Sequence, residues 1–76
     1  MIQVKKVKPL PDKKILLGFS DGLEKIIDIK PFIKKNSISS LLEDDNYFKK
    51  VKIESGGGIT WPNGYDFCPV FLHDDN

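Results

Sequence analysis

The sequence has no arginine, one cysteine and one histidine, and each scarcity excludes a kind of protein or site. Arginine supplies the planar fork that reads guanine edges and holds phosphates, so its absence argues against sequence-specific recognition of DNA. Cys68 has no second cysteine to pair with, which excludes a disulfide within the chain and fits a reducing compartment.

Long apolar segments are lacking as well. No stretch of about 18 apolar residues is present to form a transmembrane helix. The first residues, Met1 to Lys6, alternate in character and do not contain the apolar block of a signal peptide. We therefore expect no membrane association and a cytoplasmic location.

The scarcity of nucleophiles and bases limits catalysis. Cys68 and His73 are the one Cys–His combination, close to the end of the sequence and without an evident third group to orient them. We interpret Cys68 as a small buried hydrophobic residue and His73 as a surface residue. Asp21, Asp28 and Asp66 lie in or beside expected turns, where aspartate commonly bonds the backbone, so no pair of catalytic carboxylates is indicated.

Metal and phosphate sites are not indicated either. Cys68, His73, Asp74 and Asp75 lack the paired spacing of zinc ligands, and residues 43–45 lack the spaced acids and glycine of a calcium loop. The glycines at 56–58 are followed by Ile-Thr-Trp rather than by the Gly-Lys-Ser/Thr of a phosphate-binding loop, and they indicate a permissive turn. The sequence predicts a protein that is not an enzyme and has no cofactor or metal.

What is present suits a single small globular domain. The chain has 76 residues, of which 39% are hydrophobic and 30% charged, which is enough for one thin core. Charge is distributed unevenly: residues 1–38 hold nine lysines against four acids, and residues 39–76 hold three lysines against seven acids. Such asymmetry is compatible with an acidic partner or with self-association, and also with lysines that solvate the outer faces of strands.

The first half of the sequence reads as three strands. Residues 2–7 alternate in a broken pattern and are expected to end at Pro9, with a turn over residues 9–12. Residues 15–19 and 23–29 are two further strands, and Ser20-Asp21-Gly22 between them indicates a tight hairpin turn. Pro31 ends the third strand, with a single helical turn at residues 32–33.

The middle of the chain reads as helical. Ser39 or Ser40 is a candidate cap, and the spacing from Leu41 to Phe48 favours a helix, interrupted at residues 44–46, so that one helix and two short turns both remain open. Residues 51–54 and 59–61 then form strands around the glycines, and Asn63-Gly64 indicates a turn into a Tyr/Phe strand. A short helical turn with Pro69 at its first position closes the domain.

These elements predict an α+β fold: a small antiparallel sheet of about five strands, in the order β-β-β-α-β-β, with one short helix packed on one face. Residues 1–72 form the single domain, and residues 73–76 form a polar C-terminal tail that we expect to be frayed.

Several segments together are similar to a known family. Residues 19–22, 28–32 and 47–51 contribute, and the most specific piece is Trp61-Pro62-Asn63-Gly64 followed by Asp66. The chain resembles the bacterial domain of unknown function 2442 from about Val4 to Leu72. The resemblance implies a small α+β fold with an antiparallel sheet and no established activity. Some proteins of the family resemble this domain joined to a helix-turn-helix, and others occur beside another small uncharacterised protein. By association, the resemblance implies a regulatory or antitoxin-like role.

Two candidate surfaces follow from the residues. Trp61, Asn63, Tyr65 and Asp66 surround the second turn, and aromatic side chains of this kind either fill the core or anchor a protein partner. Asp21 and Asp66 are also interpreted as turn-stabilising residues. The alternative hypothesis is weak binding of a nucleic acid or other polyanion by Lys5, Lys6, Lys8, Lys13 and Lys14. The favoured partner is another protein, and a homo-oligomer formed through a sheet edge is the further expectation.

Overall fold

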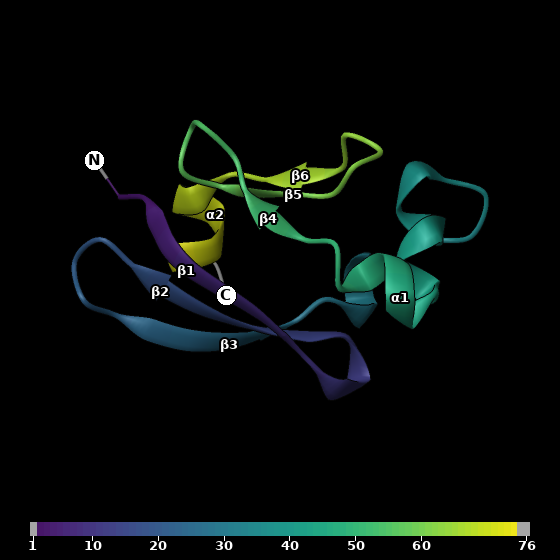
Figure 1. Cartoon of the computed structure of the whole chain (residues 1–76), viewed down its shortest axis with the longest axis horizontal. Coiled ribbons are helices and arrows are strands. Elements are labelled where there is room, and N and C mark those ends of the chain that lie inside the picture. Colours follow the sequence, from purple (N-terminus) through teal and green to yellow (C-terminus); the bar gives the residue numbers. More distant parts are fainter. Residues whose placement is uncertain (1, 75–76) are drawn as a thin grey trace.

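The computed structural model describes residues 2–74, which form two small antiparallel sheets joined by a helical middle segment (Figure 1). The first sheet has the order β1-β2-β3 and consists of β1 (Val4–Leu10), β2 (Lys14–Phe19) and β3 (Glu24–Asp28). The second has the order β4-β5-β6 and consists of β4 (Lys52–Ile53), β5 (Ile59–Thr60) and β6 (Asp66–Phe67).

The predicted α+β class with antiparallel strands is confirmed, but the expectation of one sheet is wrong. β4 pairs with β5, and β5 pairs on its other side with β6, a strand that the predicted order did not count. Between the sheets, the backbone amide of Val4 donates to the carbonyl of Gly57 at 2.6 Å, yet no ladder joins β1 to β4 among the described residues.

β1 does not end at Pro9, as the sequence suggested, but continues through Leu10. Pro9 pairs with Ile15, which pairs on its other side with Ile27. Because β1 is an outer strand and hydrogen-bonding residues alternate along a ladder, the proline nitrogen points away from β2. A proline costs no ladder hydrogen bond there, so the strand tolerates it.

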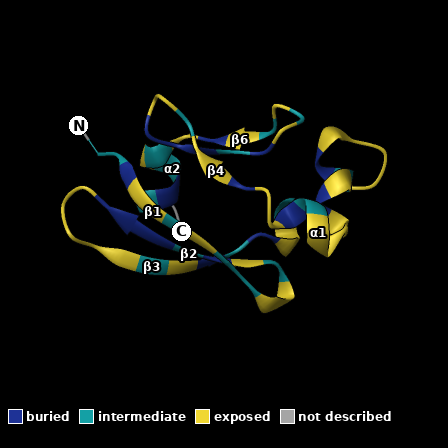
Figure 2. Ribbon diagram, in the orientation of Figure 1, coloured by how far each residue is buried: buried dark blue, intermediate teal, exposed yellow. Residues whose placement is uncertain are grey.

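The first sheet buries one face and exposes the other. On the buried face, alternate residues of the central strand form part of the core: Ile15, Leu17 and Phe19. Figure 2 shows β2 as largely buried, whereas β3 is mostly exposed or intermediate. The rest of the core comes from both sheets and from the helical segments, with Val4, Ile27, Ile29, Leu42, Phe48, Val51, Ile59, Trp61, Phe67 and Leu72 buried.

The helical middle consists of short pieces rather than one helix. Two 3₁₀ turns, η2 (Lys30–Phe32) and η3 (Ile38–Glu43), precede the single α-helical turn α1 (Asp45–Phe48), and η1 (Pro11–Lys13) connects β1 to β2. Asp44 ends η3 and caps α1 by accepting a hydrogen bond from the amide of Asn46 at 2.9 Å. The interruption at residues 44–46 is therefore a capping site.

The expected serine caps are not where the sequence placed them. Ser37, not Ser39 or Ser40, precedes η3, and its own side chain does not cap that turn. Ser39 is buried, and its hydroxyl accepts a hydrogen bond from the amide of Lys34 at 2.9 Å and shares another with Ser37. The serine closes the loop before η3 rather than starting a helix.

The C-terminal helix α2 (Pro69–Asp74) begins at Pro69 as predicted and is longer than predicted. His73 and Asp74 belong to it, whereas the sequence placed them in a polar tail; the rest of that tail, residues 75–76, lies outside the described residues. Cys68 is exposed, so its interpretation as a buried residue is wrong. The alternation of β6 explains this, because it turns Phe67 into the core and its neighbour outward.

Candidate functional site

Three hairpin turns of this chain share one backbone geometry. In each, the amide of a glycine donates to the carbonyl three residues earlier: Gly22 to Phe19 at 3.0 Å, Gly57 to Glu54 at 2.9 Å, and Gly64 to Trp61 at 2.9 Å. The three glycines have φ of 91°, 92° and 92°, a left-handed conformation that favours glycine. This is the three-residue hairpin loop in which a type I turn is followed by a left-handed residue.

A side-chain oxygen supports two of these turns in the same way. Asp21 Oδ1 accepts a hydrogen bond from the amide of Leu23 at 3.0 Å, and Asn63 Oδ1 accepts one from the amide of Tyr65 at 3.1 Å. The prediction that Asp21 stabilises its turn is confirmed. For the second turn the prediction named Asp66, and the structure assigns that hydrogen bond to Asn63 instead.

The glycine-rich turn combines left-handed backbone with close packing. A Cβ on Gly57 would lie 2.7 Å from Gln3 Cγ, and one on Gly58 would lie 2.1 Å from the carbonyl oxygen of Phe67. Gly56 has open space around it. Residues 57 and 58 are therefore glycines for steric reasons, and the turn is structural as the sequence indicated.

Trp61 lies inside the protein and not on a binding surface. Its side chain is 1% exposed, and its indole nitrogen donates to the carbonyl of Phe48 at 3.0 Å, at the end of α1. A short helical turn leaves its last carbonyls without intrahelical partners, and the indole satisfies one of them. Burial removes Trp61 from the candidate partner-binding residues and gives it a structural role.

The side chains of Asn63 and Tyr65, like that of Trp61, donate hydrogen bonds to backbone carbonyls. Asn63 Nδ2 donates to the carbonyl of Ile38 at 2.8 Å, and the Tyr65 hydroxyl donates to the carbonyl of Phe32 at 3.2 Å. Burial raises the pKa of the Tyr65 phenol, which keeps it a donor. Together with Trp61, these donors attach one hairpin turn to three backbone carbonyls of the helical middle segment. Asp66 is exposed and stays a candidate for contact with a partner.

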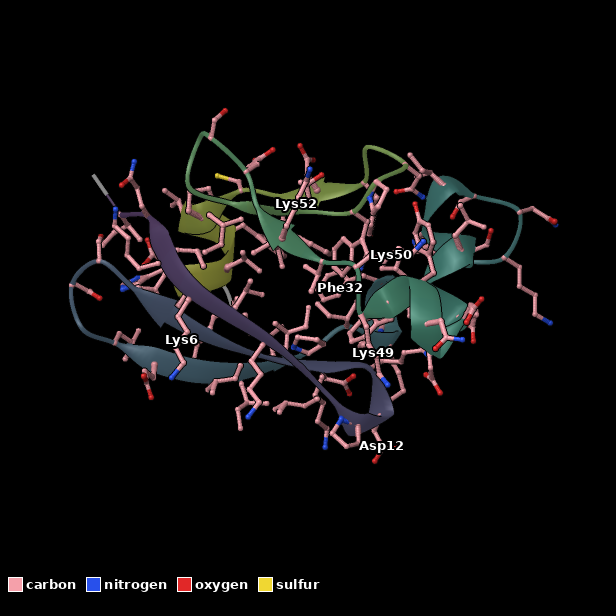
Figure 3. The ribbon with its side chains drawn as sticks, viewed as in Figure 1. Lys6, Asp12, Phe32, Lys49, Lys50 and Lys52 are labelled. Atoms are coloured by element: carbon pink, nitrogen blue, oxygen red, sulfur yellow. The ribbon has the colours of Figure 1, made fainter. Side chains whose placement is uncertain are left out.

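The N-terminal lysines do not form a single free basic patch. The Lys13 side chain is 12% exposed, is ion-paired with Asp45, and lies 5.7 Å from the centre of the Phe48 ring. Lys13 also holds the pKa of the Asp45 carboxyl below its ordinary range. Lys6 lies 3.8 Å from Glu24. Lys5, Lys8 and Lys14 are exposed, and Figure 3 shows Lys6 on the first sheet, away from Lys49, Lys50 and Lys52.

A surface hollow of about 490 Å³ lies between η1 and α1, with Asp12 and Lys49 among its lining residues (Figure 3). Asp12 and Lys13 have φ of 62° and 59°, an uncommon conformation for residues other than glycine. The Lys13–Asp45 ion pair joins this turn to α1. The hollow is lined by neither a cysteine nor a histidine and offers no pairing of nucleophile and base.

His73 is held at the end of α2 by two carboxylates. Its Nε2 lies 2.8 Å from Asp21 Oδ2, its Nδ1 contacts Asp74, and its side chain is 18% exposed, which contradicts a free surface position. The Phe19 ring meets the imidazole edge to face at 4.9 Å. The hydrogen bonds that His73 donates to Asp74 and, as the smaller effect, to Asp21 raise the pKa of the imidazole. The hydrogen bonds that Asp21 accepts from the Leu23 amide and, as the smaller effect, from His73 lower the pKa of the Asp21 carboxyl. Both ring nitrogens are occupied, so the histidine joins α2 to the first turn.

Residues 2–74 contain no group of three or more potential metal-ligating side chains. Within the same range, no helix is long and apolar enough to cross a membrane.

The remaining candidate is the outer strand β3. Ile26 is 60% exposed, the highest value among the exposed large hydrophobic residues of the described chain, and Leu23, which immediately precedes the strand, is also exposed. No further strand pairs with β3 within residues 2–74. Because Ile26 and Ile27 are adjacent, the register of the folded strand is needed to show which of the two faces the core.

The fold and these contacts define a small α+β domain whose most distinctive turn is structural and whose open strand edge is the candidate site. A family model described as "Protein of unknown function (DUF2442)" matches residues 4–74, and the chain belongs to this family. Searches of the curated proteins and of the solved structures each found no match.

Proposed function

We propose that this chain is a non-enzymatic module that binds another protein, as one member of a small regulatory or antitoxin-like pair. The observation that carries the proposal is the exposure of Ile26 on an outer strand whose second edge is paired with no strand of residues 2–74. An aliphatic side chain at such a position gains stability when a partner covers it.

Three features support binding rather than catalysis. Both ring nitrogens of His73 are engaged by carboxylates. Cys68 is exposed in the sequence position between β6 and α2. The aromatic residues of the family's distinctive turn are used to hold the chain's own helical middle. Among the exposed large hydrophobic residues of the described chain, Ile26 has the largest exposed fraction, which favours the surface of the first sheet.

The proposal is tested by recovering the tagged chain from the cells that encode it and identifying what is bound. Ile26→Lys removes the exposed apolar group, and Ile53→Lys is the matched control, because Ile53 is also an exposed strand isoleucine, in the second sheet. We expect one partner to be retained by the native chain and the control and lost by Ile26→Lys. A folded native chain that retains no partner, or equal retention by both variants, contradicts the proposal.

A salt titration with duplex and single-stranded DNA separates this function from polyanion binding by the exposed lysines. Binding through phosphates weakens steeply as salt rises. Tight DNA binding that is lost in Lys8→Ala and Lys14→Ala would replace the proposed protein partner with a nucleic acid.

A further inference from the structure

The backbone of β3 presents alternate peptide groups to solvent. Two hydrogen bonds fix the phase of the ladder: Phe19 N to Leu23 O at 2.8 Å and Ile29 N to Lys13 O at 2.9 Å. In an antiparallel ladder, residues that bond the neighbouring strand alternate with residues whose amide and carbonyl point away. The peptide groups of Glu24, Ile26 and Asp28 therefore face the open edge of the sheet.

The side chains of the same three residues lie on the exposed face of the sheet. Ile27 and Ile29 point into the core, so their neighbours along the strand point outward. The open edge therefore presents backbone amides and carbonyls next to three side chains: the acidic Glu24, the aliphatic Ile26 and the acidic Asp28.

The opposite edge of the sheet is protected. Pro9 has no amide to offer at the outer side of β1, and the amide of Val4 is already bonded to Gly57. β3 contains no proline, and the charges on its outer face are the acids Glu24 and Asp28 rather than the lysines that most often blunt an edge.

Pairing of β3 with β3 of a second copy is disfavoured. In a two-fold antiparallel pairing centred on Ile26, Glu24 of each copy would face Asp28 of the other. Directly opposed like charges destabilise a strand pair. Lysine or arginine at those two positions of a different strand would instead form opposite-charge pairs.

We infer that β3 accepts an extended segment of its protein partner, which adds as an antiparallel strand. That segment carries a basic residue, an aliphatic residue and a basic residue at alternate positions. The inference rests on the proposed function, since it names the partner's chemistry at the same surface. Main-chain hydrogen bonds supply affinity, and the two basic residues opposite Glu24 and Asp28 supply register and selectivity.

The test uses the full chain and capped synthetic peptides. The matching peptide is Ser-Lys-Val-Ile-Thr-Lys-Ser, whose lysines face Asp28 and Glu24 when its isoleucine faces Ile26. One control replaces both lysines by glutamate, and another methylates the amide of the peptide isoleucine. Amide hydrogen exchange of the ¹⁵N-labelled protein is followed residue by residue by NMR.

We expect the matching peptide to slow exchange at Glu24, Ile26 and Asp28, while Lys25 and Ile27 change little because their amides already face β2. The glutamate peptide should bind about tenfold more weakly, and the methylated peptide should give no protection. Glu24→Lys with Asp28→Asn should reverse the preference between the two charged peptides. Glu43→Lys with Asp66→Asn makes the same charge change elsewhere and should leave the preference as it was.

Absence of protection at these three amides, or equal affinity for the two charged peptides, overturns the inference. Protection of the same amides in the free chain together with a dimer in sedimentation overturns it in favour of a second copy. The two proposals fail separately. If the chain captures a cellular partner but its β3 edge binds no peptide, only the inference of strand addition is refuted. If the edge binds the peptide but the chain captures no cellular partner, only the proposed function is refuted.

Discussion

The indole nitrogen of Trp61 donates a buried hydrogen bond to the backbone carbonyl of Phe48, 13 residues earlier in the chain. The rings of the two residues are also in contact, with centroids 5.9 Å apart. This relationship changes the meaning of the Trp-Pro-Asn-Gly stretch. The sequence left open whether these aromatic residues fill the core or bind a partner, and Trp61 attaches its turn to the helical middle segment.

The first prediction concerns these hydrogen bonds. Tyr65→Phe removes only the hydroxyl that bonds the Phe32 carbonyl, and we expect a loss of about 1 kcal/mol in the free energy of unfolding. Trp61→Phe removes the indole hydrogen bond to the Phe48 carbonyl, which then keeps only the 3.4 Å bond from the Val51 amide. The substitution also reduces side-chain volume, so its loss should exceed about 2 kcal/mol. Urea unfolding monitored by circular dichroism measures both values. Unchanged stability in the two variants would contradict the structural role.

The second prediction distinguishes neighbouring glycines. Gly58→Ala places a Cβ against the Phe67 carbonyl, and we expect a destabilisation of roughly 2–3 kcal/mol or failure to fold. Gly56→Ala is the matched control, because its Cβ meets nothing within 4 Å, and its stability should stay close to that of the native chain. Thermal unfolding of the two variants measures the difference. Equal effects would show that the turn does not have this packing.

The third prediction is a pH dependence set by His73. Its pKa is raised in the folded chain above the ordinary 6.5, so the stability it contributes is complete below that pH and is lost as pH rises through the folded-state pKa. Asp21, whose pKa is lowered, contributes stability that is present above about pH 4 and is lost on acidification. We expect the melting temperature to fall over the range from about pH 6.5 upward.

His73→Gln is the control for that dependence. Glutamine keeps a polar side chain near Asp21 and does not titrate, so the decline above neutrality should be absent in this variant. A native chain whose melting temperature is flat over the same interval would refute the ionic contact between α2 and the first turn.

The fourth prediction concerns the lysine that joins η1 to α1. Lys13→Ala removes the amine above the Phe48 ring and should cost about 1 kcal/mol, judged from that ring contact alone. Lys14→Ala, one position along and exposed, should cost much less. Chemical denaturation of both variants decides the matter, and a similar effect of the two substitutions would argue against a special role for Lys13.

Local signals were sufficient for much of the fold. Asp21-Gly22 and Asn63-Gly64 place two hairpins because a left-handed residue is needed there, and Pro69 marks the start of α2 for a comparable reason. The positions where the sequence misled depend on tertiary contacts. Pro9 remains in β1 because β1 is an edge strand. The division into two sheets follows from the absence of a hydrogen-bonded ladder between β1 and β4 in the described residues.

The candidate site was harder to predict than the fold. An exposed Ile26 beside a buried Ile27 is a matter of register, which pairing with Leu16 and Ile15 decides. The donors of Trp61, Asn63 and Tyr65 could have found partners outside the chain or inside it. Only the positions of the Phe48, Ile38 and Phe32 carbonyls show that they are used internally.

The most direct test of the account is the fluorescence of Trp61, the single tryptophan of the chain, with acrylamide as a collisional quencher. Because the indole is 1% exposed and hydrogen-bonded to Phe48, emission of the native protein should be blue-shifted and resist quenching, and urea should abolish both properties. Native emission that is red-shifted and quenched as readily as in the unfolded chain would place Trp61 at the surface and contradict the structural assignment of its turn.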